Sequence, residues 1–319
     1  MSLSPLLTVA ALSALLLVPQ TSEPELATTV LAPGVFLVAG EVGRGSEGRP
    51  NAGFVVTADG VVVIDALGTP QEGRALVRAI RRQTKAPIRW LILTHHHPDH
   101  AFGAIELRHA GARVMAHPDH TMLASDNGFD NLTADWVRTR GIEAMRGFVY
   151  ADTADRAVSM PHDSLRIGTR TIRLWHPASP AHTAGDLVVH LPDAGVVFAG
   201  DLLIEDGISM VVDGRSALLL SALDSLRAFG ATMVVPGHGA IQRDGARALI
   251  DSTQSYLRAL RQTMRAAVEG NVPMRRAMAG LPQPDELRPV SVNSRLRRNA
   301  ARVYVEMERE ALGLGGGSP

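Results

Sequence analysis

One six-residue stretch, His95-His96-His97-Pro98-Asp99-His100, constrains this chain more than any other feature. It directly follows residues 88–93, a largely apolar run typical of a buried strand. Imidazoles crowded together are costly unless a cation organises them as neutral donors. The cluster therefore predicts a metal site at the end of a buried strand, in preference to a solvated polar loop.

Alternation along an extended segment predicts how these side chains divide. Residues two apart point to the same side, so we expect His95 and His97 to face one way and His96 to point the other way, as an outer-shell or solvent-facing residue. Asp99 continues the alternation, whereas the adjacent His100 needs a turn to reach a neighbouring position. The loop thus predicts two metal positions.

Short apolar strands alternate with helical patterns beyond residue 30. Two segments, 59–65 and 193–201, share a turn, a short strand and a terminal aspartate, which places Asp65 and Asp201 at strand ends, where α/β proteins hold their chemistry. The pattern predicts an α/β fold, a sandwich of two mixed β-sheets flanked by helices. We expect strands at 35–38, 53–57, 61–64, 88–93, 112–116, 164–175 (a hairpin around Gly168), 187–191, 196–199 and 233–235, and helices at 71–83, 101–109, 216–229, 245–269 and 294–312.

Residues 126–150 are less regular and are expected to form a helical insertion or lid over the site. Trp136 and Phe148 would then be apolar contacts of a substrate pocket. An ordinary peripheral helix pair, with Trp136 as a core residue, is the alternative.

Composition excludes several classes of function. The 32 basic residues balance the 32 acidic ones, so we expect a small-molecule substrate and no nucleic-acid partner. The chain has no cysteine, which excludes disulfides, thiolate catalysis and cysteine-ligated zinc. The oligomeric state is left open by the sequence.

The N-terminus carries an apolar run from Leu6 to Val18, followed by a polar, proline-containing segment. Its length predicts a signal peptide over residues 1–24, hence a periplasmic or secreted protein without stable membrane insertion after cleavage. The run lacks a preceding Lys or Arg, so a loose N-terminal helix on a cytoplasmic protein is the alternative. The remaining chain divides into a domain over 30–270 and a helical extension over 271–319.

The spacing His95-x-His97-x-Asp99-His100, followed by Gly103, resembles the HxHxDHxxG signature of metallo-β-lactamase-fold hydrolases. Further segments are similar to the family's downstream motifs, in the same order: residues 181–186 around His182, 198–201 ending in Asp201, and 235–239 around His238. The resemblance runs from about residue 35 to 240 and implies the metallo-β-lactamase fold.

The resemblance also implies a ligand set. One zinc ion would be held by His95, His97 and His182. The second would be held by Asp99, His100 and His238, with Asp201 bridging the two. Nitrogen and oxygen donors suit Zn²⁺ and also accept Fe or Mn. Asp65 would support the His95 loop, although a simple turn carboxylate is the alternative.

Two such cations would share a water and lower its pKa toward ~7, so that a bridging hydroxide attacks an ester, thioester, lactone or lactam. Asp99 would be the catalytic residue that accepts a hydrogen bond from this hydroxide. Asp201 stands where β-lactamase subclasses have Cys or Ser, so the pattern looks more like hydroxyacylglutathione hydrolases, lactonases and phosphodiesterase relatives. By analogy alone, it also resembles zinc hydrolases associated with periplasmic quinoprotein and sulfur-oxidation systems.

Several alternatives stay open. They are β-lactamase activity on the same site, a mononuclear iron persulfide dioxygenase, and a non-catalytic periplasmic binding or assembly factor. If the substrate is a glutathione thioester, Arg295, Arg297 and Arg298 are candidates to grip it, although their spacing is not diagnostic.

Overall fold

The computed structural model describes residues 24–121, 129–150, 153–279, 281 and 290–314. The predicted signal peptide, apart from residue 24, lies outside the described residues, as do residues 126–128 of the expected insertion. Within the described part of the chain, no helix is both long and apolar enough to cross a membrane.

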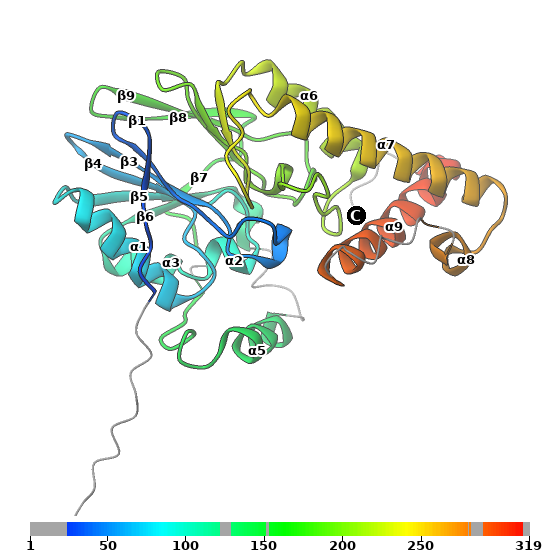
Figure 1. Ribbon diagram of the computed structural model, residues 1–319, viewed down its shortest axis with the longest axis horizontal. Coiled ribbons are helices and arrows are strands. Elements are labelled where there is room, and N and C mark those ends of the chain that lie inside the picture. Colours follow the sequence, from blue (N-terminus) through cyan, green and yellow to red (C-terminus); the bar gives the residue numbers. More distant parts are fainter. Residues whose placement is uncertain (1–23, 122–128, 151–152, 280, 282–289, 315–319) are drawn as a thin grey trace, which may run out of the picture.

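Two mixed sheets face each other, with helices on both outer faces (Figure 1). This is the αββα arrangement that the sequence predicts. The first sheet runs in chain order through β1 Thr29–Ala32, β2 Val35–Val38, β3 Ala52–Thr57, β4 Gly60–Ile64, β5 Ile88–Ile92, β6 Arg113–Ala116 and β7 Arg156–Ala157. The second has the order β12 Met233–Val235, β11 Val196–Phe198, β10 Val188–Leu191, β9 Arg170–Trp175 and β8 His162–Ile167.

The helices lie outside the two sheets. They are α1 Pro70–Gln83, α2 Pro98–Ala101, α3 Ala104–His109, α5 Phe129–Arg140, α6 Ser216–Ala228, α7 Arg247–Glu269, α8 Met274–Ala279 and α9 Val290–Ala311. Helix α1 begins where Thr69 accepts a hydrogen bond from the Glu72 amide, with Pro70 in the first turn, where proline's missing N–H costs nothing.

Alternating apolar side chains divide the core into three layers. On β4, Val61 and Val63 pack toward α1 and α3, while Val62 and Ile64 pack between the sheets. The second sheet alternates in the same way: β11 turns Val197 toward the layer of α6, α7 and α9. A strand with both faces buried must be apolar throughout, which is why these runs are visible in the sequence.

Parallel pairing brings the strand ends together. Strand β4 pairs in parallel with β5, and β11 with β12, so the loops that follow these four strands meet at one edge of the sandwich. Strands β6 and β7 continue the parallel part of the first sheet, and antiparallel strands β1–β3 and β8–β10 complete the two sheets.

The prediction of one continuous helix over 101–109 is wrong. The chain instead forms α2 and α3, interrupted at Phe102 and Gly103. Gly103 donates its N–H to Leu67 O, and a Cβ at this position would lie 2.0 Å from Ala66 O. The close approach to the loop after β4 breaks the helix, and no helical periodicity reveals it.

Two strands, β1 and β7 at the two edges of the first sheet, have no counterpart among the strands expected from the sequence. The short helix α8 lies within the helical segment expected after residue 270. Helix α9 starts four residues earlier than expected.

Candidate metal centre

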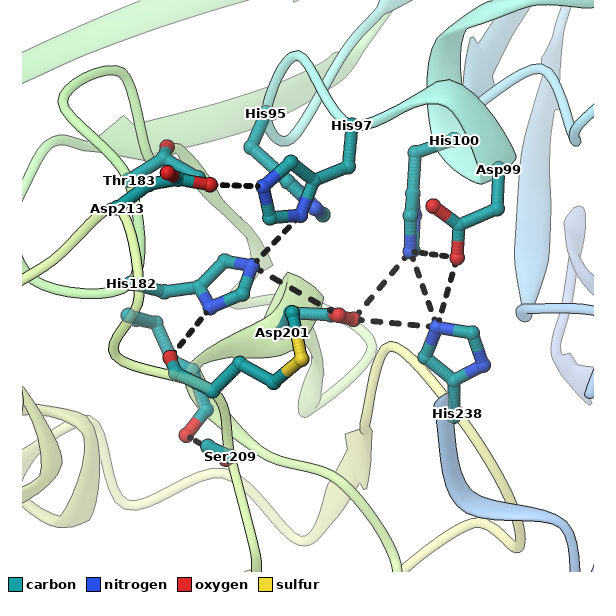
Figure 2. Close-up of polar contacts among 12 residues, drawn as sticks. His95, His97, Asp99, His100, His182, Thr183, Asp201, Ser209, Asp213 and His238 are labelled. Atoms are coloured by element: carbon teal, nitrogen blue, oxygen red, sulfur yellow. Dashed lines mark hydrogen bonds and ion pairs between the residues drawn. The ribbon is translucent and has the colours of Figure 1, made fainter. Parts of the chain in front are cut away.

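The seven predicted ligands come from separate loops and converge at the edge where the parallel strands end (Figure 2). His95 and His97 follow β5, and Asp99 and His100 lie on α2. The other three are His182 between β9 and β10, Asp201 after β11 and His238 after β12.

Among the described residues, three groups of possible donor atoms each lie within 4.8 Å, and two of these groups consist of predicted ligands; the third is His96, His97 and Asp213. We name position one the group of His95, His97 and His182, with which Asp201 is also grouped, and position two the group of Asp99, His100 and His238. The three histidines assigned to the first zinc ion lie together at position one, and the three residues assigned to the second lie together at position two.

Position one is built from three imidazoles packed edge to face. His97 and His182 have ring centroids 4.7 Å apart at 88°, and His95 meets them at 80° and 83°. His182 Nε2 lies 3.1 Å from His97 Nδ1. His95 Nε2 is buried and makes no hydrogen bond.

Position two combines two imidazoles with one carboxylate, and their donor atoms lie close together. His238 Nε2 lies 3.0 Å from Asp99 Oδ2 and 3.4 Å from His100 Nε2. Both imidazoles are fully buried, whereas the Asp99 side chain is 14% exposed. Asp99 is therefore the donor at this position that solvent, and hence a substrate, reaches.

Asp201 lies between the two positions (Figure 2). One carboxylate oxygen, Oδ2, is 3.7 Å from His182 Nε2, and the other, Oδ1, is 3.3 Å from His100 Nε2. A Cβ on Gly237 would lie 1.8 Å from Asp201 Oδ1, so the glycine of the Pro-Gly-His-Gly segment makes room for this carboxylate.

Charges within the cluster are set by burial and by neighbours. Burial and the surrounding imidazoles hold the pKa of His95 well below its usual range. Burial opposes the charge of His100, but Asp99, Asp201 and Asp65 raise the pKa of that imidazole well above its usual value. Burial likewise opposes ionisation of Asp99, yet His100 and His238 lower its pKa to about 2. The cluster therefore presents neutral His95 and ionised Asp99 as donors.

Asp65 supports the site as the resemblance implies. Its carboxylate accepts hydrogen bonds from the Thr94 amide at 2.8 Å and the Thr94 hydroxyl at 2.9 Å, and it pairs with His100 Nδ1 at 2.9 Å. It thus fixes the start of the histidine loop and one imidazole at position two. A carboxylate behind a histidine is the common orienting partner in metal sites.

Two further residues that were not predicted from the sequence support the histidines of the site. Asp213 pairs with His97 Nε2 at 2.9 Å, and this contact lowers the pKa of Asp213 to about 2. Asn51 donates from Nδ2 to Pro236 O and Gly239 O, which flank His238. Neither residue belongs to a dense motif, so a single sequence carries no signal for them.

The prediction for the insertion is answered only in part. Trp136 on α5 donates from Nε1 to Gly68 O at 2.6 Å, and its ring packs against Phe102, as does that of Phe148. The two side chains belong to an aromatic cluster next to the site. Their role as substrate contacts stays a prediction.

Sandwich and donor set together define a class of protein. Residues 45–238 match the model of the metallo-beta-lactamase superfamily, and the chain belongs to this superfamily.

Curated relatives narrow the similarity. The hydroxyacylglutathione hydrolase of Cereibacter sphaeroides is 28% identical over 190 residues, covering 59% of this chain and 62% of the relative. That of Brucella ovis is 29% identical over 171 residues, covering 53% and 55%. The chain thus spans about three fifths or less of the length of these relatives.

Solved structures share the fold. A metallo-beta-lactamase family protein from Thermus thermophilus has a TM-score of 0.66 at 21% identity, covering 91% of this chain and 98% of the other. The stereoselective inverting sec-alkylsulfatase of a Pseudomonas species has a TM-score of 0.69 at 15% identity, covering 92% and 51%.

Proposed function

We propose that this protein is a hydrolase that works with two divalent metal ions, zinc in the first instance, at positions one and two. The observation that carries the proposal is the pair of donor groups joined by Asp201, with His95 Nε2 buried and without a hydrogen bond. A buried imidazole nitrogen with no partner is costly in a protein interior, and a cation compensates it.

The donor chemistry supports zinc without selecting it alone. All seven donors are imidazole nitrogens or carboxylate oxygens, a set that Fe and Mn also accept. When bound, such ions lower the pKa of a coordinated water and polarise a carbonyl or phosphoryl oxygen.

Asp99 has the position of a catalytic residue within this proposal. Its Oδ2 is engaged with His238 at 3.0 Å, while the carboxylate remains partly exposed. An ionised, exposed carboxylate in this place accepts a hydrogen bond from the attacking water and orients it toward the substrate. The side chain of His97 is also partly exposed, at 15%, so solvent reaches the site next to His97 and Asp99.

For the substrate, we propose a small thioester of the hydroxyacylglutathione kind, ahead of esters, lactones and β-lactams. The names of the similar curated proteins support this order. The idea that Arg295 grips the substrate is wrong, because its side chain is 2% exposed and paired with Asp206. Arg297 and Arg298 are exposed.

Metal analysis and a substrate panel test the proposal. We expect close to two zinc ions per chain and hydrolysis of a hydroxyacylglutathione, compared with a lactone, nitrocefin and a phosphodiester. Asp99→Ala is expected to lower kcat by roughly 10²–10⁴-fold, the usual contribution of a positioned acid or base. Activity that survives this change would exclude the assigned role.

Two other functions give distinct outcomes. One iron per chain with oxygen consumption would indicate a persulfide dioxygenase, and a metal-loaded protein inactive on every substrate would indicate a binding or assembly factor. The presence of His238 and Asp99 beside His100 supports a second metal position.

We also propose export to the periplasm or outside the cell. Support comes from the apolar run over residues 6–18. Fractionation of cells expressing the full chain, with N-terminal sequencing of the mature protein, tests this assignment; an uncleaved protein in the cytoplasmic fraction contradicts it.

A further inference from the structure

We propose that helix α9, in the C-terminal extension, positions metal position one by holding the segment of residues 206–216. Two contacts on that segment orient the imidazoles of the site. His182 Nδ1 pairs with Met210 O at 2.8 Å, and His97 Nε2 pairs with Asp213 at 2.9 Å. The inference rests on the proposed metal centre and concerns residues far from it in the sequence.

One face of α9 contacts this segment at successive turns. The contacting residues are spaced by three or four positions, which places them along one side of the helix. They are Arg295, Asn299, Arg302 and Glu306.

Asn299 is the central contact. It is fully buried, accepts a hydrogen bond from Val211 N at 3.0 Å and donates to Ser209 O at 3.0 Å. These two groups flank Met210, the residue whose carbonyl holds His182. The side chain of Asn299 therefore holds the peptide unit that contains this carbonyl, through Val211 N–H, and the preceding peptide unit, through Ser209 O.

Arg302 holds the other end of the segment. Its Nε and Nη2 both donate to Gly214 O, at 3.0 and 2.9 Å. Gly214 directly follows Asp213, the partner of His97. The next residue, Arg215, donates its N–H to Pro180 O and Ala181 O, so the segment is also joined to the backbone that precedes His182.

The flanking contacts complete the attachment. Arg295 binds both carboxylate oxygens of Asp206 and donates to Ile208 O, while Glu306 accepts a hydrogen bond from Ser216 N at 3.0 Å. A bidentate arginine–carboxylate pair such as Arg295–Asp206 fixes geometry as well as adding energy. The segment is thereby held from its first residue to its last.

Another face of α9 has a separate role. Ala300, Val303, Tyr304 and Met307 are buried in the core cluster that α7 also joins. In Figure 1, α9 lies alongside α7, and the two helices are in contact. A purely structural helix would need only this apolar face. The polar face, directed at the backbone around two imidazole partners, indicates the positioning role.

The test uses Asn299→Ala and a matched control, Val303→Ala, which shortens a buried side chain on the apolar face. Zinc affinity is measured by chelator competition, and the electronic absorption of the cobalt-substituted protein reports the coordination. We expect Asn299→Ala to lower the affinity for one of the two zinc ions by roughly 10–100-fold, the usual effect of removing a supporting partner. Val303→Ala should lower thermal stability and leave both affinities within about threefold.

A double variant assigns the affected ion to position one. In a His182→Ala background, Asn299→Ala should cause no further loss of zinc affinity, because its effect acts through His182. Additive losses would overturn the inference. Arg302→Lys should retain more affinity than Arg302→Met, because lysine still offers a donor to Gly214 O.

A measurement on the metal-free protein distinguishes failure of the positioning role of α9 from failure of the proposed function. In the metal-free protein, amide hydrogen exchange over residues 206–216 should rise in Asn299→Ala and not in Val303→Ala. Equal zinc affinities and exchange in the two variants would overturn the inference alone. A wild-type protein that binds no divalent ion would overturn the proposed function and this inference together.

Discussion

Asp65 and His100, 35 residues apart in the chain, form a buried pair with 2.9 Å between Oδ2 and Nδ1. Asp65 sits at a φ of +59°, in the left-handed region that non-glycine residues seldom occupy. Backbone strain of this kind persists where surrounding contacts over-determine it, often at functional sites. The conformation turns the chain at the end of β4 while its carboxylate faces α2.

Replacing Asp65 should therefore weaken the metal centre. We expect Asp65→Ala to lower zinc affinity by about 10–100-fold, because His100 and the Thr94 amide both lose their partner. Asp65→Asn tolerates the left-handed backbone and keeps an acceptor for Thr94, so it should preserve more thermal stability than Asp65→Ala while still losing affinity. Equal affinity in wild type and Asp65→Ala, measured by chelator competition, would contradict the supporting role.

Asp213 offers a second mutation with a specific signature. Asp213→Asn keeps the size of the side chain but removes the negative charge beside His97 Nε2. Because this carboxylate is about half exposed, global stability should change little. Zinc affinity should fall at position one, with the spectrum of the cobalt protein altered. An unchanged spectrum would show that His97 does not depend on Asp213.

Gly103 should not tolerate a side chain. A Cβ there would lie 2.0 Å from Ala66 O, so Gly103→Ala must displace either α2 or the loop after β4. We expect a loss of about 1–3 kcal/mol in the free energy of unfolding, as for other overpacked sites. Gly270→Ala is the control, with a φ of −82° and its nearest neighbour at 3.1 Å. Denaturant unfolding of both variants measures the difference, and equal losses would contradict the account.

Removal of metal should destabilise the folded protein. An ion that binds only the native state stabilises it by about 2.7 kcal/mol at a free concentration a hundred times its dissociation constant. Thermal unfolding with and without a strong chelator should show this difference in wild type. The shift should shrink in His238→Ala, which lacks one donor of position two. An identical shift in both proteins would argue against metal at this position.

Proton competition should make metal binding pH-dependent. The carboxylates around His100 raise its pKa, so the free protein keeps a proton on this imidazole that a metal ion must displace. Zinc affinity should therefore rise with pH through the neutral range, with proton release detected by calorimetry in buffers of different ionisation enthalpy. Binding without proton release would contradict the assigned protonation.

The raised pKa of His100 also makes the stability of the metal-free protein depend on pH. A histidine whose pKa is higher in the folded state contributes stability below its unfolded pKa, and this contribution is lost as the pH rises through the folded value. After metal has been removed with a chelator, the free energy of unfolding should thus fall as the pH rises above neutrality. His100→Gln removes the titrating group and should flatten this part of the stability profile.

The sequence by itself determined the sandwich and pointed to the seven side chains that the fold brings together. Buried strands must be apolar, and metal donors must be a few residue types at close spacing, so both leave a local signal, as at residues 88–100. Only the tertiary structure decided the rest. Asp213, Asn51 and Asn299 act through one or a few hydrogen bonds to backbone or imidazole across long sequence separations, as the separation of 116 positions between His97 and Asp213 illustrates. The break at Gly103 likewise depends on a backbone that approaches from another loop, and such contacts arise only when the chain has folded.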